Sequence, residues 1–269
     1  MPPGPAVPSP FAGRRHCHGG TRDDSSRDKE RRRRGDAVVS EFVFVTDVSP
    51  YRDAAGTASL AGAHHSLPSA AATAGQIAQL HGLSFRHVAQ AGDLSAADLE
   101  RARLLMLFTI GETGWAQEQR AVIERRVRQG RLGFVGMHSA SDSAYSWPAY
   151  GEFIGARFAG HPVTGVLPVQ VIDDVHPATR HLPRRWPFNE EFYLFSDLAE
   201  DRHDLLGIEF GPDHDGTGSQ VLPLAWCIER GPMRTFYTGL GHFGAAYENV
   251  DFVRHLGGGV SWVLSGLQP

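Results

Sequence analysis

Three short runs of the sequence contain almost only apolar residues, and they restrict the possible folds more than any other feature. The runs are residues 41–46 (EFVFVT), 103–109 (RLLMLFT) and 132–137 (LGFVGM). Uninterrupted apolar runs of this length are typical of strands that are buried on both faces in a parallel sheet. We therefore expect all three segments to be buried parallel strands.

Helical signals separate these runs. Pro68 starts a predicted helix that continues to Leu80, and a further strand is predicted for residues 84–89. Ser95 begins a capping-box pattern in which an aspartate replaces the usual glutamate. Residues 113–129 carry apolar side chains at helical spacing. Alternating strands and helices predict a parallel sheet that is covered on both faces.

The second half of the chain has more β signals than the first. A final helix is predicted for residues 249–264, and the predicted strands are 166–172, 192–195, 205–209, 221–228 and 234–237. The last two strands are joined across Gly231-Pro232 and form a predicted antiparallel hairpin. The expected fold class is therefore α/β: a three-layer, doubly wound and mainly parallel sheet with a β-rich C-terminal half.

Residues 1–36 differ in composition from the rest of the chain. They contain nine of the 26 Lys and Arg residues and five of the 17 prolines, but almost no large apolar side chain. Such a segment cannot bury enough surface to offset the entropy lost on ordering, which predicts a disordered Arg/Pro-rich tail. A solvated tail, or a start codon placed too far upstream, is favoured over a tether for nucleic acid or an anionic surface. Residues 37–269 are predicted to form a single domain.

Charge and cysteine content narrow the function classes. The tail carries a formal charge of +4, so the −4 of the whole chain leaves −8 for the predicted domain. An acidic domain argues against a nucleic-acid partner, and no apolar run approaches the roughly 18 residues that span a membrane. The two cysteines, Cys17 and Cys227, indicate no disulfide framework and fit a reducing cytoplasm. A homo-oligomer is left open.

Polar side chains follow several of the predicted strands, at the edge where an open α/β sheet binds its ligands. They come from distant parts of the sequence: His64, Glu112, His138, Ser139, His161, Glu190, Glu191 and His242. Imidazoles beside a carboxylate suit proton transfer at neutral pH, with effects of roughly 10²–10⁴ on rate. The same groups also suit a divalent metal such as zinc, so both hypotheses stay open.

Each of these residues also has a structural interpretation without a function. Ser139 fits a helix N-cap, and His64 fits a surface loop. His161 fits a turn before a proline, and Glu191 fits the solvated start of a strand. The number of polar groups that follow strands favours a shared site over these separate explanations.

Other polar or reactive residues are not expected to act. Five further histidines lie in polar loops or in a helix and are expected at the surface: His176, His181, His203, His214 and His255. Cys227 lies in an apolar strand, so thiol catalysis is not expected. The glycines at 257–259 lie inside the final predicted helix and indicate close packing rather than a phosphate cradle.

Several strings of the sequence together resemble the ThuA-like (trehalose-utilisation) family. The strings are HHSLP at 64–68, GFVGMHSASD at 133–142, WPAYGEFIGARFAGHP at 147–162, DDVHPATRHLP at 173–183, EEFYLF at 190–195, PLAWC at 223–227, TFYTGLGH at 235–242 and FVRHLGGGVSWVL at 252–264. The resemblance implies a flavodoxin-like, class I glutamine-amidotransferase-like fold without the amidotransferase cysteine. It also implies a role in the metabolism of trehalose, related disaccharides or their keto derivatives.

The resemblance transfers family positions to His64, His138-Ser139, His161, Glu191 and His242, with Glu190 in place of the family's usual aspartate. On this basis we expect an enzyme with a small carbohydrate ligand. Its acid–base pair would be His138 and His242, with Glu191 as the orienting carboxylate. The substrate would contact His64, Ser139, His161 and Glu112. The alternatives are a non-catalytic sugar-binding or partner subunit and a His-ligated, metal-dependent hydrolase.

Overall fold

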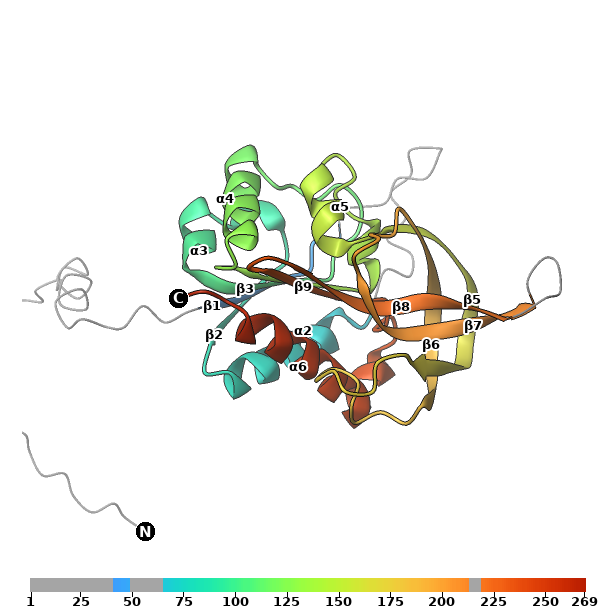
Figure 1. Ribbon diagram of the computed structural model, residues 1–269. Helices are drawn as coiled ribbons and strands as arrows, with labels where there is room; N and C mark the ends of the chain where they lie inside the picture. Colours follow the sequence, from blue (N-terminus) through green and yellow to red (C-terminus); the bar gives the residue numbers. More distant parts are fainter. Residues whose placement is uncertain (1–40, 49–64, 213–218) are drawn as a thin grey trace, which may run out of the picture. The chain divides into compact units, whose positions relative to one another are not determined.

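The computed structural model describes residues 41–48, 65–212 and 219–269 (Figure 1). The predicted tail, His64 and His214 lie outside these residues. None of the described helices is long and apolar enough to cross a membrane.

Helices and strands alternate through the first part of the described chain, and strands dominate the second. In chain order the elements are β1 (Glu41–Val45), α2 (Leu67–Leu80), β2 (Ser84–Val88), η1 (Ala91–Asp93), α3 (Ala96–Arg101), β3 (Ala102–Leu107), α4 (Gln117–Arg128), β4 (Gly133–Met137), η2 (His138–Asp142), α5 (Pro148–Ile154), β5 (Arg157–Val171), β6 (Arg185–Ser196), β7 (His203–Pro212), β8 (Ser219–Arg230), β9 (Met233–Thr238), η3 (Gly244–Glu248) and α6 (Val250–Ser265).

The described strands form one mixed sheet in the order β2-β1-β3-β4-β9-β8-β7-β5-β6. The strands from β2 to β9 pair in parallel, and those from β9 to β6 pair antiparallel. The expected mainly parallel arrangement therefore describes only the first half of the sheet. The expected β8–β9 hairpin, in which Arg230 pairs with Met233 across a two-residue turn, begins the antiparallel half. The departure from the expectation lies beyond it, where β7, β5 and β6 add antiparallel pairs between distant segments.

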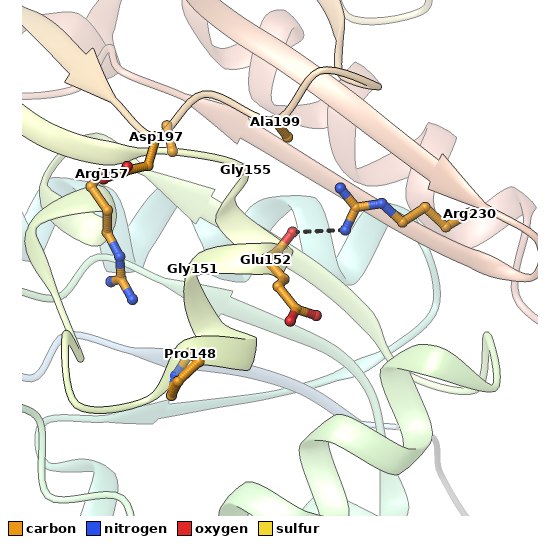
Figure 2. Close-up of a pocket in the computed structure, with 9 residues that line it drawn as sticks. Pro148, Gly151, Glu152, Gly155, Arg157, Asp197, Ala199 and Arg230 are labelled. Atoms are coloured by element: carbon orange, nitrogen blue, oxygen red, sulfur yellow. Dashed lines mark hydrogen bonds between the residues drawn. The ribbon is translucent and has the colours of Figure 1, made fainter.

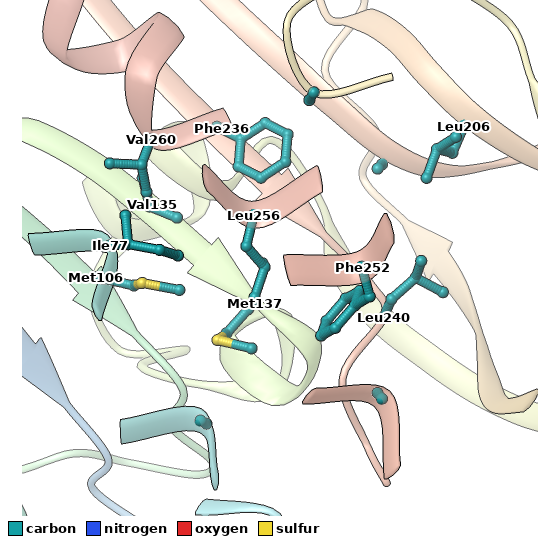
Figure 3. Packing of buried hydrophobic residues seen from close by; sticks show 14 of the residues in the cluster. Ile77, Met106, Val135, Met137, Leu206, Phe236, Leu240, Phe252, Leu256 and Val260 are labelled. Carbon is teal, nitrogen blue, oxygen red and sulfur yellow. The ribbon is translucent and has the colours of Figure 1, made fainter. Parts of the chain in front are cut away.

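Helices cover both faces of the parallel half (Figure 1). On one face, α2 and α6 pack through Ile77, Phe252 and Leu256 against Val135 and Met137 of β4 (Figure 3). On the other face, α3, α4 and α5 enclose a second buried cluster. These two cores hold β4 and β9 in the interior of the sheet.

Several helix boundaries follow their predicted signals. The hydroxyl of Ser95 accepts the backbone N–H of Asp98, whose carboxylate accepts the backbone N–H of Ser95, so the capping box is confirmed. The side chain of Asn249 caps α6. Helix α4 begins later than expected because the Gln119 side chain accepts the backbone N–H of Ala116 and fixes the helix start there. Helix α5 was not predicted.

Two histidines that were expected at the surface are buried. His255 is fully buried between the carbonyl of Ala178 and the hydroxyl of Thr238, and His176 is also buried. Burial lowers the pKa of each imidazole to about 4. The local sequence did not indicate burial, because His176 follows Asp173 and Asp174 in a predicted loop and His255 follows Arg254 in a predicted helix. Tertiary packing supplies the burial that a local pattern does not reveal.

The expectation for Cys227 is confirmed, and the expected close packing is confirmed for Gly258 and Gly259 but not for Gly257, whose Cβ would meet open space. Cys227 is buried, and burial raises the pKa of its thiol to about 12. A Cβ at Gly258 would lie 2.2 Å from the carbonyl oxygen of Pro177, and one at Gly259 would lie 2.4 Å from the ring of Phe236. These glycines therefore serve close packing of α6.

Candidate functional site

His138 and His242 meet because β4 and β9 are adjacent parallel strands. Met137 at the end of β4 pairs with Thr238 at the end of β9, so the residues that follow share one edge of the sheet. The Nε2 atom of His138 lies 3.0 Å from the Nδ1 atom of His242. The expectation that these two imidazoles lie together at the carboxyl edge of the parallel strands is met.

The His138 ring is held in one orientation. Its Nδ1–H donates to the carbonyl of Gly239 at 3.0 Å, and its own carbonyl accepts the hydroxyl of Tyr237 at 2.7 Å. A carbonyl can only accept, so Nδ1 carries the proton and Nε2 presents the lone pair in the neutral ring. The backbone of His138 has φ of 43°, a left-handed conformation that costs a non-glycine residue about 1–2 kcal/mol. The fold thus maintains a strained turn that aims Nε2 at His242.

Glu191 adds a carboxylate to the two imidazoles. One of its oxygens, Oε2, lies 3.3 Å from Nδ1 of His242 and 3.6 Å from Nε2 of His138. Burial alone would raise the pKa of Glu191, but the two histidines lower it far below its ordinary value through hydrogen bonding and charge. Glu191 is therefore ionised at neutral pH. We call His138, Glu191 and His242 the histidine–glutamate cluster.

Glu191 reaches this position because the β5–β6 pair does not stay in line with the rest of the sheet. β5 begins at Arg157, nine residues before its predicted start at Val166, and its pairing with β6 shifts register twice between Phe158 and Val163. Such bulges bend and twist a strand pair. The ring of Tyr193 in β6 consequently packs on His138, with ring centroids 4.3 Å apart.

His161 lies within this bulged segment of β5 and not in a simple turn. Its Nδ1 atom is 3.4 Å from Oε1 of Glu191, the carboxylate oxygen that faces away from the other two histidines. Half of the His161 side chain is exposed, whereas His138 is fully buried. The cluster is therefore closed on the His138 side and open on the His161 side.

Glu190 is a buried carboxylate that accepts hydrogen bonds from the backbone around His242. It accepts the backbone N–H of Gly241 at 2.6 Å, that of His242 at 3.1 Å and that of Glu191 at 2.9 Å. Burial raises the pKa of Glu190, and the charge of His138 and the backbone donors offset part of that shift. Gly241 has φ of 119°, and a Cβ there would lie 2.8 Å from the hydroxyl of Tyr247. The glycine thus brings the backbone close to Glu190 and Tyr247.

The carboxylates also act on His242. Burial alone would lower the pKa of its imidazole, but hydrogen bonding to Glu191 and the charges of Glu191 and Glu190 raise it above the ordinary value. His242 therefore holds a proton to higher pH than a free histidine. Its orientation toward His138 and Glu191 makes it the proton-bearing ring of the cluster.

Asp142 places a second acidic group at the open side. It ends the η2 turn that begins at His138, and it accepts the hydroxyl of Tyr145. Burial raises the pKa of Asp142, while the Tyr145 hydroxyl and the charge of His161 offset part of the shift. In the sequence, Asp142 looked like a residue of a helix's first turn. Tyr193 and the anchoring role of Glu190 were not expected, because each depends on the bend in β5–β6.

The remaining predicted residues are placed differently. Glu112 is exposed, and its two carboxylate oxygens accept the backbone N–H and the hydroxyl of Ser146, each at 2.8 Å. Ser139 is fully buried beside His138, and its hydroxyl has no hydrogen-bond partner among the described residues. The structure therefore does not bring Glu112 to the cluster. The substrate contacts of Ser139 and Glu112 stay predictions.

A cavity of about 570 Å³ is lined by Gln129, Arg131, Gln268 and Pro269, none of them a predicted site residue. Two smaller cavities among the described residues differ in their relation to the cluster. One of about 100 Å³ is lined by Phe188, Asn189, Phe243 and Asn249, among others, and the Phe243 ring lies 4.7 Å from that of His242. The other, of about 360 Å³, lies between α5 and the ends of β5, β6 and β8 (Figure 2). None of the predicted site residues in the described part of the chain lines either cavity, but Phe243 links the smaller one to His242.

The arginines of the cavity beside α5 are already engaged by the protein. Arg230 binds the carboxylate of Asp201 through two nitrogens, each at 2.6 Å, and also donates to the carbonyl of Glu152 (Figure 2). Arg157 donates to the carbonyl of Ser143. These contacts give the cavity a structural explanation, so the histidine–glutamate cluster is the better candidate site.

Fold and site together define an α/β protein with a mixed sheet and a histidine–carboxylate cluster at the carboxyl edge of its parallel strands. The family model described as trehalose utilisation, ThuA, matches residues 56–263. The chain therefore belongs to the ThuA family. The predicted family membership is confirmed, and all three cluster residues lie inside the matched segment.

Solved structures show the same fold at low sequence identity. A ThuA-like protein from Bacteroides uniformis matches with a TM-score of 0.66 and 17% identity, over 86% of this chain and 93% of that chain. A ThuA-like protein from Parabacteroides merdae matches with a TM-score of 0.65 and 18% identity, over 85% of this chain and 91% of that chain. The carbohydrate deacetylase Agd3 matches with a TM-score of 0.52 and 12% identity, over 84% of this chain and 32% of that chain. The comparison with curated proteins gave no match.

Proposed function

We propose that this ThuA-family chain is an enzyme that acts on trehalose, a related disaccharide or a keto derivative of one. The observation that carries the proposal is the convergence of His138, His242 and Glu191 on one point at the carboxyl edge of the parallel strands. The family description, trehalose utilisation, supplies the substrate class. The reaction class is either proton transfer to or from a sugar oxygen or hydrolysis by a water molecule that the cluster activates.

The surroundings of the cluster suit a carbohydrate. Sugars present hydroxyl groups to polar side chains and C–H faces to aromatic rings. Phe243, whose ring contacts that of His242, also lines the cavity of about 100 Å³, together with the carboxamides of Asn189 and Asn249. The half-exposed His161 and the acidic Asp142 add polar groups at the open side. At about 100 Å³ this cavity holds only part of a disaccharide, so the rest of the substrate would extend over the open side.

Each cluster residue has a distinct proposed role. His242, whose pKa is raised, is the proposed acid–base residue that faces the substrate, and His138 exchanges a proton with it across their 3.0 Å contact. Glu191 orients both rings and stabilises the protonated form of His242. His161 would contact a sugar hydroxyl, as would His64, which lies outside the described residues.

The test is turnover by the purified full chain. Trehalose and oxidised trehalose are incubated separately with the wild-type chain and with His242→Ala, and the products are separated by chromatography. We expect product from the wild type and a loss of at least about 100-fold in His242→Ala, the lower end of the usual acid–base contribution. His203→Ala serves as the matched control, because His203 is an exposed histidine that pairs with Asp173 instead.

Equal turnover by the wild type and His242→Ala would reject the assignment of the cluster. Calorimetric binding of either sugar without any product would instead favour a non-catalytic sugar-binding subunit. Because both measurements use the same protein samples, the two outcomes are directly comparable.

A further inference from the structure

We propose that the histidine–glutamate cluster binds one divalent transition-metal ion, with Nε2 of His138, Nδ1 of His242 and Oε2 of Glu191 as its ligands. The ligand atoms of these three residues all lie within 4.8 Å of one another. The inference rests on the proposed function for its substrate, and it replaces proton exchange between the two imidazoles, because a nitrogen that ligates a metal carries no proton. It can be tested without any sugar.

The spacing of the three atoms fits a metal better than it fits hydrogen bonds. They lie 3.0, 3.3 and 3.6 Å apart. Metal–ligand bonds of about 2.0–2.1 Å in a tetrahedral site place neighbouring ligands about 3.3–3.4 Å apart. Charge-assisted hydrogen bonds between nitrogen and a carboxylate are shorter, at about 2.7–2.9 Å. The two distances to Glu191 exceed that range, and the three distances bracket the tetrahedral value.

The orientation of His138 also matches that of a metal ligand. Metal-binding histidines usually donate their second ring N–H to a carbonyl or carboxylate, which fixes the ring and directs the other nitrogen at the metal. The Nδ1–H of His138 donates to the carbonyl of Gly239 in this way. The strained backbone of His138 and the hydroxyl of Tyr237 on its carbonyl keep Nε2 aimed at the cluster.

The other two ligands, His242 and Glu191, are positioned by Glu190 and are partly exposed to solvent. Glu190 fixes the backbone of Gly241 and His242, and so it sets the position of the His242 ring. His138 is fully buried, whereas the side chains of Glu191 and His242 are 16% and 20% exposed. Three protein ligands with an open side are typical of a catalytic metal site and not of a structural one.

The donor set indicates which ion the cluster would take. Two imidazoles and one carboxylate suit Zn²⁺ or Fe²⁺, whereas Mg²⁺ and Ca²⁺ prefer oxygen ligands. One carboxylate leaves a net charge of +1 on a divalent ion. Such a centre attracts an oxygen that is losing a proton, from water or a sugar hydroxyl. The metal would therefore supply Lewis-acid activation at the place where we propose that the sugar binds.

The direct experiment is a Zn²⁺ titration of the full chain, produced without an affinity tag and freed of metal by dialysis against a chelator. We expect calorimetry to show one equivalent of Zn²⁺ per chain and no comparable site for Mg²⁺. Removal of a ligand in His242→Ala or Glu191→Gln should weaken Zn²⁺ binding by at least about 100-fold. Co²⁺ provides a second readout, because its visible spectrum reports the coordination geometry and should be lost in both variants.

His203→Ala is the control for binding by a surface histidine, since His203 forms an exposed pair with Asp173 at 2.7 Å. It should bind Zn²⁺ like the wild type. Thermal unfolding of each variant without metal shows that a loss of binding is not a loss of folding. Absence of a saturable one-equivalent site in the wild type would overturn the inference, as would Zn²⁺ binding that survives both ligand substitutions.

Failure of this inference and failure of the proposed function have different signatures. Zn²⁺ binding without turnover of any sugar would keep the metal site and reject the sugar chemistry. Sugar turnover by a chain that binds no Zn²⁺ and is unaffected by chelator would reject the metal site and keep proton transfer by the imidazoles.

Discussion

The parallel and antiparallel halves of the sheet contribute to the site in different ways. The parallel half supplies His138 and His242 from the ends of two neighbouring strands, where adjacent parallel strands must bring successive residues together. The antiparallel half supplies Glu191 and His161 from the interior of two long strands. Topology is enough to explain the first pair. The second pair also requires the register shifts in β5 that bend the β5–β6 pair toward β4 and β9.

The two halves also differ in what they supply: the parallel half provides the imidazoles, and the antiparallel half provides the carboxylates that shift the pKa of His242. The imidazoles of the parallel half lie on an edge that many α/β proteins use for ligands. The antiparallel half supplies the charge that makes these imidazoles unusual, because Glu191 and Glu190 raise the pKa of His242. Substitutions in β6 should therefore damage the site as much as substitutions in the histidines themselves.

The largest expected effect is that of Glu191→Gln on turnover of the proposed sugar substrate. The amide has nearly the same shape but lacks the negative charge that orients and stabilises His242. We expect the rate to fall by roughly 10²–10⁴, as for His242→Ala. Steady-state kinetics of the two variants under the same conditions provide the measurement.

His161→Ala tests the same strand pair with a weaker expected effect, because His161 contacts only the outer oxygen of Glu191. A full rate for Glu191→Gln combined with a null rate for His242→Ala would show that the parallel half acts alone. That result would mean that the charge supplied by β6 does not contribute to the chemistry.

The next effect is that of Glu190→Ala on the free energy of unfolding. The substitution leaves the buried backbone N–H of Gly241 and the partly buried backbone N–H groups of His242 and Glu191 without their acceptor. Unsatisfied buried donors cost about 1–3 kcal/mol each when they cannot rearrange, so we expect a loss of about 3 kcal/mol in urea unfolding. Glu190→Gln retains one acceptor oxygen and should lose less. Wild-type stability for Glu190→Ala would mean that β6 does not anchor the loop after β9.

Much of the fold could be predicted from the sequence, because local patterns determine it. Apolar runs predicted β1, β3 and β4, and the Ser95 capping box and the Gly231-Pro232 hairpin formed as expected. The mainly parallel sheet was the exception. Strand pairing between distant segments depends on where the chain re-enters the sheet. No local pattern in β5–β7 predicts that these strands pair antiparallel in the order β8-β7-β5-β6.

The site was predictable to the extent that it depends on strand ends. His138 and His242 follow strands at glycine-bordered turns, and this pattern indicated both. Glu191 was transferred from the family pattern, and its distance from the histidines could not be derived because it depends on the bulges of β5. Glu112 also follows a strand, but Ser146 engages its carboxylate away from the cluster.

Stability should also depend on pH through two buried histidines. His255 contacts Thr238 of the parallel half, and His176 follows β5 of the antiparallel half. Each has a pKa of about 4 when folded, below the ordinary value of 6.5, so the unfolded chain binds protons first as pH falls. Stability is therefore lost on acidification from pH 6.5 towards 4, by roughly 2 kcal/mol per histidine between pH 7 and pH 5.

Urea unfolding at pH 7 and pH 5 measures this loss, and His255→Gln isolates one contribution. The glutamine cannot gain a proton, so the pH-dependent loss should shrink by about 2 kcal/mol in the variant. Carboxylates with lowered pKa, such as Asp98 at about 2, lose their contribution only at lower pH. An unchanged pH dependence in His255→Gln would exclude the buried neutral histidine as its source.

The smallest expected effect is that of one methyl group on α6, which covers the parallel half. In Gly259→Ala the new Cβ would lie 2.4 Å from the ring of Phe236 in β9, which is itself fully enclosed, so either the helix or the strand must move. We expect a loss of about 1–2 kcal/mol in the free energy of unfolding. Gly257→Ala is the matched control, because no atom lies within 4 Å of its Cβ and alanine favours the helix by up to about 1 kcal/mol. The two variants change the same residue type within one helical turn, so opposite shifts in melting temperature isolate packing against β9 from helix propensity. If Gly259→Ala also shifts β9, the His138–His242 distance should change with it and turnover should fall, whereas equal stabilisation by both substitutions would show that α6 does not fix β9.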